Sequence, residues 1–144
     1  MINFVRMRKL IKAEEQTRWA IEKAKSRAEK ITISISKSGG GGESFRKGSR
    51  VEEGAIAISV LREEYQGISD ELEGQREELK GLMRSIRTDK YRLEKLCLKM
   101  RYLKGLSART IAEALNYSEP YIFEKLGSGE RLISGLQEKE HSSP

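Results

Sequence analysis

A regular apolar repeat between residues 51 and 86 constrains the fold more than any other feature of the chain. Its positions alternate spacings of three and four residues, with the polar Gln75 and the small Gly54 as exceptions. The repeat runs through Val51, Gly54, Ile58, Leu61, Tyr65, Ile68, Leu72, Gln75, Leu79, Leu82 and Ile86. Such a heptad repeat forms the contact seam of a coiled coil, and a polar seam residue commonly fixes its register. The pattern predicts a long helix over residues 51–88 whose seam packs on another helix.

A second helix is predicted before this one, over residues 1–37. Leu10, Ala13, Thr17, Ala20 and Ala24 recur at three and four residues and form a narrow seam, with residues 31–37 as a frayed helix end. Residues 1–50 hold 13 Lys and Arg against 5 Glu, whereas residues 51–88 hold 5 against 9 Asp and Glu. The basic helix therefore either neutralises the acidic one or contacts a polyanion.

A Gly/Ser-rich stretch over residues 38–50, which includes Gly39 to Gly42, predicts a flexible connector between the two helices. The tethered helices favour an antiparallel hairpin, because closing a short loop costs little entropy. The same heptad could instead meet a second copy of the chain, and we expect a homo-oligomer in addition to the hairpin. Trp19 is expected to pack on the hairpin.

Several classes of protein are excluded by the composition. One cysteine, Cys97, rules out a disulfide framework and a multi-cysteine metal site. One histidine, His141, leaves no imidazole for a folded catalytic site, so we expect no enzyme, no cofactor and no metal. There is no stretch of 18 apolar residues, and Arg and Lys interrupt the apolar residues at the start. We therefore expect a cytoplasmic protein that does not enter a membrane.

The pattern changes after residue 88. Leu93, Leu96, Met100 and Leu103 share one face of a helix that is expected to end at Lys104-Gly105. Ser107 is a predicted N-cap of the next helix, Asn116 a left-handed turn residue, Ser118 the N-cap of a third helix and Pro120 a first-turn residue. This spacing predicts a helix-turn-helix within residues 89–136. The whole chain is then all-α: a long helical hairpin followed by a small helix-turn-helix domain.

The segment RYLKGLSARTIAEALNYSEPYIFEKL (residues 101–126) resembles region 4 of sigma-70-type factors. Most of residues 5–126 also resemble small regulatory proteins encoded by prophages and mobile elements of Gram-positive bacteria. The resemblance implies a phage transcriptional regulator that binds double-stranded DNA in the bacterial cytoplasm. RNA polymerase is the protein partner that it suggests.

The candidate DNA-binding residues lie in and around the second helix of this motif. Ser118 and Arg109 are expected to anchor phosphates, and Lys125 to read or clamp the DNA. The full set is Arg101, Lys104, Ser107, Arg109, Ser118, Glu119, Tyr121, Glu124, Lys125 and Arg131. This second helix, which we call the reading helix, is expected to end after two turns at Gly127-Ser128-Gly129. Residues 137–144 are expected to form a disordered tail.

Two other functions fit the same residues. A phage packaging protein of the small-terminase type also joins a helix-turn-helix to an oligomerising coiled coil. Alternatively, Glu119 and Glu124 make the reading helix acidic, which suits a module that binds another protein, such as RNA polymerase.

Overall fold

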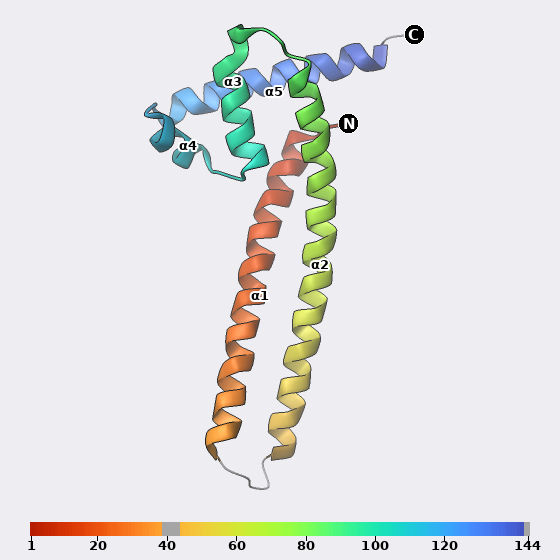
Figure 1. Cartoon of the computed structure of the whole chain (residues 1–144), viewed down its shortest axis with the longest axis vertical. Coiled ribbons are helices and arrows are strands. Elements are labelled where there is room, and N and C mark those ends of the chain that lie inside the picture. Colours follow the sequence, from red (N-terminus) through yellow and green to blue (C-terminus); the bar gives the residue numbers. More distant parts are fainter. Residues whose placement is uncertain (39–43, 143–144) are drawn as a thin grey trace. The chain divides into compact units, whose positions relative to one another are not determined.

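The structure is a computed structural model that describes the backbone of residues 1–38 and 44–142, and the side chains of residues 1–30 and 52–139. Every regular element in these residues is helical, as the sequence predicts (Figure 1). The long helices are α1 (Phe4–Ser38), α2 (Ser44–Arg84) and α5 (Glu119–Ser142). The short elements between α2 and α5 are the 3-10 turn η1 (Asp89–Tyr91), α3 (Arg92–Leu98), the π-helical turn η2 (Lys99–Leu103) and α4 (Ala108–Leu115).

Helices α1 and α2 pack side by side as the predicted antiparallel hairpin (Figure 1). Arg6 of α1 forms two hydrogen bonds with Glu71 of α2, with N···O distances of 3.1 and 2.8 Å. Farther along, the Arg18 guanidinium donates to the Tyr65 hydroxyl at 3.3 Å. The chain divides into two compact units: Met1–Ile11 and Glu71–Pro144 form unit 1, and Lys12–Asp70 form unit 2.

Unit 2 is the part of the hairpin with little buried surface. The predicted seam residues Ile58, Leu61, Tyr65 and Ile68 are half-buried, as are Ala13, Thr17, Ala20 and Ala24 of α1. Ile21 is the one apolar side chain in the described part of unit 2 that is fully buried. The expected packing of Trp19 is wrong: its side chain is 63% exposed, with the Lys23 ammonium 4.7 Å from its ring centroid. Trp19 lies beside Ala20 of the seam and therefore faces solvent.

Unit 1 has a true hydrophobic core to which all five helices contribute. The predicted seam residues Leu72, Leu79 and Leu82 are buried in it, together with Cys97, Leu98, Ile111, Ile122 and Ile133. The first residues of the chain belong to the same core, because Ile2, Phe4, Met7, Leu10 and Ile11 are all buried. Sequence reasoning missed this role, although the spacing of Phe4, Met7 and Ile11 already marks one apolar helix face.

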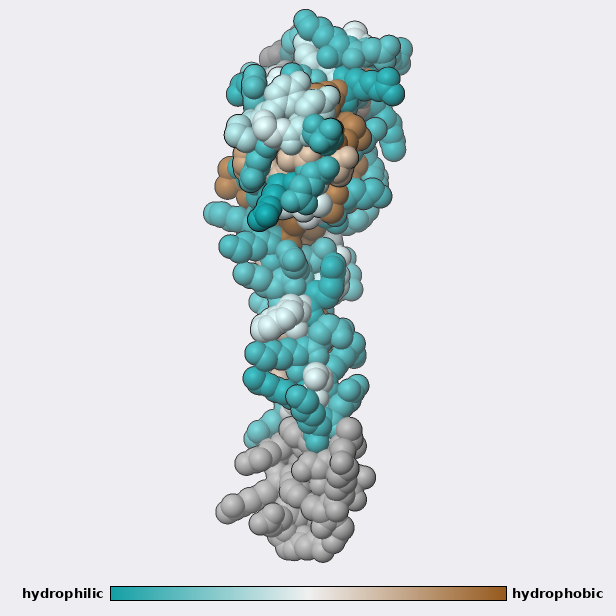
Figure 2. Space-filling view, turned by 90° about the vertical axis from the view of Figure 1, so that its left-hand side faces the viewer, coloured by the Kyte–Doolittle hydropathy of each residue, from teal (hydrophilic) through white to brown (hydrophobic). Residues whose placement is uncertain are grey.

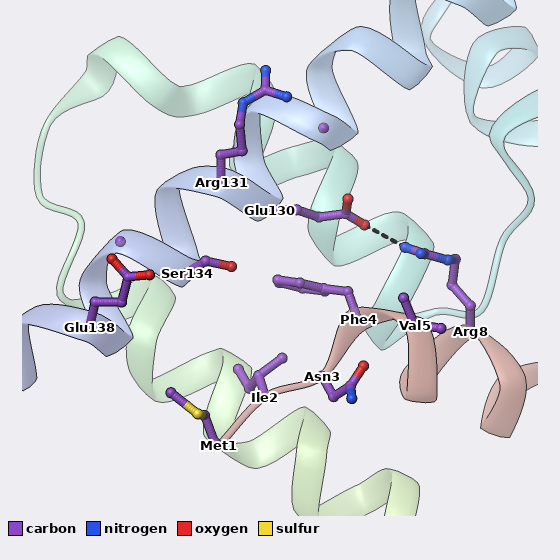
Figure 3. Close-up of a pocket in the computed structure, with 12 residues that line it drawn as sticks. Met1, Ile2, Asn3, Phe4, Val5, Arg8, Glu130, Arg131, Ser134 and Glu138 are labelled. Atoms are coloured by element: carbon purple, nitrogen blue, oxygen red, sulfur yellow. Dashed lines mark hydrogen bonds and ion pairs between the residues drawn. The ribbon is translucent and has the colours of Figure 1, made fainter. Parts of the chain in front are cut away.

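A polar cluster ties the start of α1 to η2 and α5. Arg8 donates to the Tyr102 hydroxyl and to Glu130, both at 2.8 Å, and the Tyr102 hydroxyl also bonds to Glu130. The Phe4 ring packs on the Tyr102 ring, with centroids 5.0 Å apart. Figure 3 shows the Arg8–Glu130 pair at the edge of an open hollow that residues 1–8 and α5 line together.

The ends of α2 differ from the prediction. Residues 44–50 are helical rather than part of the connector, while Gly39 to Gly42 lie outside the described residues. At the other end α2 stops at Arg84 instead of residue 88, and the backbone amides of Ser85 and Ile86 close the last turn on the carbonyls of Leu82 and Met83. Ile86, the last predicted seam position, is buried beyond the end of the helix.

The prediction that the reading helix ends at Gly127-Ser128-Gly129 is wrong. Helix α5 continues through Gly127, Ser128 and Gly129 to Ser142, so residues 137–142 are helical and not a disordered tail. Each glycine costs the helix about 1 kcal/mol relative to alanine, but burial of the apolar side chains of Leu126 and Ile133 in the core of unit 1 offsets that cost. Tertiary packing here overrides the local preference of the glycines.

Candidate nucleic-acid interface

The segment from Ser107 to Leu126 has the local structure that its capping residues predict. The Thr110 backbone amide donates to the Ser107 side chain at 3.2 Å, which confirms Ser107 as the N-cap of α4. Asn116 ends α4 in the left-handed conformation, with φ 60° and ψ 45°. Ser118 caps α5 through the Tyr121 backbone amide at 3.3 Å. Three residues therefore connect two capped helices.

A small apolar core fixes α4 against α5. Ile111 and Ile122 are completely buried, and Ala112 and Leu126 are 5% exposed. The small Ala112 side chain lies on the buried face of α4, together with Ala108 and Ile111. This core determines which side chains of the first turns of α5 face outward. That α4 and α5 act as a DNA-binding helix-turn-helix remains a prediction.

The outward face of α5 is acidic and aromatic. Glu119 and Glu124 are exposed, and so are Phe123, at 58%, and Tyr117 in the preceding turn, at 47%. The predicted residue Tyr121 is half-buried, with its ring centroid 4.8 Å from that of Tyr117. In Figure 2, brown apolar atoms reach the surface of unit 1 among the hydrophilic ones. Sequence reasoning missed Tyr117 and Phe123, although Phe123 follows the buried Ile122 and so must lie off the buried face.

Lys125 is engaged inside unit 1. Its ammonium lies 3.4 Å from a carboxylate oxygen of Glu94, whose side chain is largely buried, and 5.3 Å from the Tyr121 ring centroid. The Glu94 carboxylate raises the pKa of Lys125 above its usual value. A buried carboxylate needs such a cation, so Lys125 has a structural task besides its predicted contact with DNA.

The other predicted cations are spread over unit 1. Arg101 donates to the Leu106 carbonyl at 3.2 Å, across the turn that precedes α4. Arg109 is well exposed and pairs with Glu113, one turn along α4, at 3.5 Å. Lys104 is exposed close to the same turn. Arg131 is also exposed, but it lies about 18 Å along α5 from Glu119 and lines the hollow of Figure 3.

Comparison with known proteins adds no relative: no protein-family model, no curated protein and no solved structure matches the chain. Within the described residues, no group of three or more His, Cys, Asp or Glu side chains is arranged to hold a metal ion. None of the described helices is both long enough and apolar enough to cross a membrane.

Proposed function

We propose that this protein is a sequence-specific DNA-binding regulator, encoded by a phage or mobile element, that reads duplex DNA with α5. The observation that carries the proposal is the capped α4–turn–α5 unit, with Asn116 left-handed and the first turns of α5 exposed. A recognition helix presents its N-terminal residues to the base edges of the major groove. The resemblance of residues 101–126 to region 4 of sigma-70-type factors supports the same function.

In this proposal the side chains divide between base contacts and phosphate contacts. Glu119 and Glu124 accept hydrogen bonds from cytosine amino groups, as carboxylates do in the major groove. Ser107, Ser118, Lys104 and the exposed Arg109 contact phosphates next to the groove. Because the acidic residues of α5 repel phosphate, the α4–α5 face by itself supplies little affinity that is independent of sequence.

A second candidate function follows from the exposed aromatic rings. Tyr117 and Phe123 expose about half of their surface beside Glu119 and Glu124. Aromatic residues are enriched at the centres of protein interfaces, and acidic neighbours favour a basic partner surface. A protein that contacts RNA polymerase through this face fits these residues.

Selection from a pool of random duplexes separates the two functions. For the DNA-binding function we expect an enriched motif that the double variant Glu119→Gln/Glu124→Gln changes or loses. The matched control is Glu52→Gln/Glu53→Gln, which removes the same charge from exposed residues of unit 2 and should leave the motif unaltered.

The proposal of sequence-specific binding fails if no motif is enriched by the parent protein. In that case the second function predicts that purified RNA polymerase binds the chain, and that Tyr117→Ala/Phe123→Ala abolishes this binding. The variants of the glutamates of α5 and of the two aromatic residues change only exposed side chains. Circular dichroism should therefore show that they keep the helical content of the parent.

A further inference from the structure

Two adjoining hollows on unit 1 are each lined by several cationic side chains. One lies along η1, α3 and η2, and the other lies between α3, η2 and the last turns of α2. Lys95 and Lys99 line both hollows, and Asp89 is the acidic residue among their lining side chains. We call the cations of this region the α2–α3 basic surface: Lys80, Arg84, Arg92, Lys95 and Lys99.

Three cations of the α2–α3 basic surface are unpaired. Lys80 pairs with Glu77 at 2.9 Å, and the Lys95 ammonium donates to the Ile86 carbonyl. Arg84, Arg92 and Lys99 are exposed, and none of them forms an ion pair or hydrogen bond through its side chain within the described residues. Glu77 offsets part of the charge of Lys80 and Arg84, since both lower the pKa of its carboxylate, but Arg92 and Lys99 have no carboxylate partner within the described residues. An anionic ligand would therefore relieve the mutual repulsion of these cations.

The packing of α3 holds this surface outward. Glu94, Cys97 and Leu98 form the buried face of α3, where Leu98 lies against α5 at Gly129. Arg92, Lys95 and Lys99 follow one another at spacings of three and four residues, on another face of the same helical stretch. The bond from Lys95 to the Ile86 carbonyl fixes α3 to the end of α2. The cations of both helices therefore form one preformed surface.

The stretch of chain that contains most of these cations is strongly basic. Residues 84–104 hold 8 Lys and Arg against 2 Asp and Glu, a net charge equal to the +6 of the whole chain. Glu94 is buried against Lys125, so its carboxylate offsets little of the exposed charge. The sequence alone did not indicate Lys80, Arg84, Arg92, Lys95 and Lys99 as binding residues, because their places along the chain do not show that they line the same surface.

We propose that the α2–α3 basic surface binds the phosphate backbone of duplex DNA. The inference rests on the proposed function for its choice of DNA as the partner. It also supplies what the acidic face of α5 lacks, namely affinity that does not depend on sequence. Each cation placed on a phosphate releases condensed counterions, so binding through this surface depends steeply on salt.

The test measures binding of a 20-base-pair duplex of arbitrary sequence to the full chain over a series of salt concentrations. Arg92→Gln/Lys99→Gln should weaken binding on the order of tenfold at low salt. It should also make the negative slope of log K against log salt shallower by about 1.8, because each lost phosphate contact accounts for about 0.9. The matched control Lys9→Gln/Lys12→Gln removes the same charge from exposed positions of α1. It should keep the parent's slope and affinity to within about twofold.

An unchanged salt slope in Arg92→Gln/Lys99→Gln would overturn the proposal. The proposal would also be overturned if these substitutions weakened binding to polyglutamate as much as binding to DNA. Failure of the proposed function gives a different result. If α5 reads no sequence, Arg92→Gln/Lys99→Gln still lowers the slope, whereas Glu119→Gln/Glu124→Gln changes no motif. Both substitutions of the test lie on exposed side chains, and unaltered thermal melting verifies that the fold is intact.

Discussion

Gly129 lies where α5 packs tightly on α3. A methyl group at this position would meet two side-chain carbons of Leu98 at 3.0 Å and the Glu94 carbonyl oxygen at 3.4 Å. Leu98 is fully buried, so we expect Gly129→Ala to overpack this contact and to cost more than the helix gains. We expect a net loss of about 1 kcal/mol in the free energy of unfolding, measured by urea denaturation followed by circular dichroism.

Gly127 is the matched control for this prediction. A methyl group there meets only the end of the flexible Arg131 side chain, at 3.5 Å. Gly127→Ala should therefore stabilise the protein by about 0.5–1 kcal/mol through helix propensity alone. Equal effects of the two substitutions would contradict the close α3–α5 contact.

Tyr102 should make the free energy of unfolding fall as the pH becomes alkaline. Burial and the hydrogen bond to Glu130 raise the pKa of its phenol well above the usual value. Above about pH 10 the unfolded chain loses this proton while the folded chain keeps it, so stability falls by up to about 1.4 kcal/mol per pH unit. Tyr102→Phe should cost about 1 kcal/mol at pH 7 and should flatten the decline between pH 10 and 11.

The exposed Tyr117 provides the comparison for the pH dependence of unfolding. Tyr117→Phe should retain the parent's decline above pH 10, because this phenol is exposed in the folded protein. Burial raises the pKa of Cys97 and Glu94 raises that of Lys125, so both residues add to the decline in the same direction in every variant. The difference between the two Phe variants therefore isolates Tyr102, and parallel curves would refute its role.

At the scale of the element, α4 depends on its cap. Helix α4 spans only Ala108–Leu115 and gains little from propagation, so the bond from the Thr110 amide to Ser107 matters more than in a long helix. Ser107→Ala should lower the free energy of unfolding by about 1 kcal/mol, whereas Ser107→Asp, which still caps, should stay near the parent value. Urea midpoints measure both, and an equal loss in both variants would show that the cap contributes nothing.

Local chemistry made several elements predictable from the sequence. The heptad repeat indicated the hairpin, the serines marked both N-caps, and Asn116 marked the left-handed turn. The length of α5 was not predictable in this way, because Gly127 and Gly129 are helical only through packing on α3. The α2–α3 basic surface was also hidden, since folding alone brings Lys80 and Arg84 of α2 beside Lys95 and Lys99.

At the scale of the whole molecule, the two units bury their apolar residues to different extents. Unit 1 encloses its core, whereas the seam residues of unit 2, such as Leu61 and Ile68, stay half-buried. Ile56 and Val60, one turn apart on α2, are 64% and 56% exposed. A hairpin of two helices leaves part of each apolar face open to solvent, and packing of two hairpins into a four-helix bundle would bury it. The half-exposed seam therefore favours the expected homo-oligomer through unit 2.

Sedimentation of the full chain over a range of micromolar concentrations tests this expectation. We expect a concentration-dependent dimer that Ile56→Lys/Val60→Lys abolishes, because two charges would then have to be buried in the interface. The helical content should be unchanged, since both side chains face solvent in the single chain. Val5→Lys places a charge on an exposed apolar residue of unit 1 and should leave the dimer intact. A chain that stays monomeric at every concentration would show that the hairpin is stable without a partner. It would also argue against the packaging function, which needs an oligomerising coiled coil.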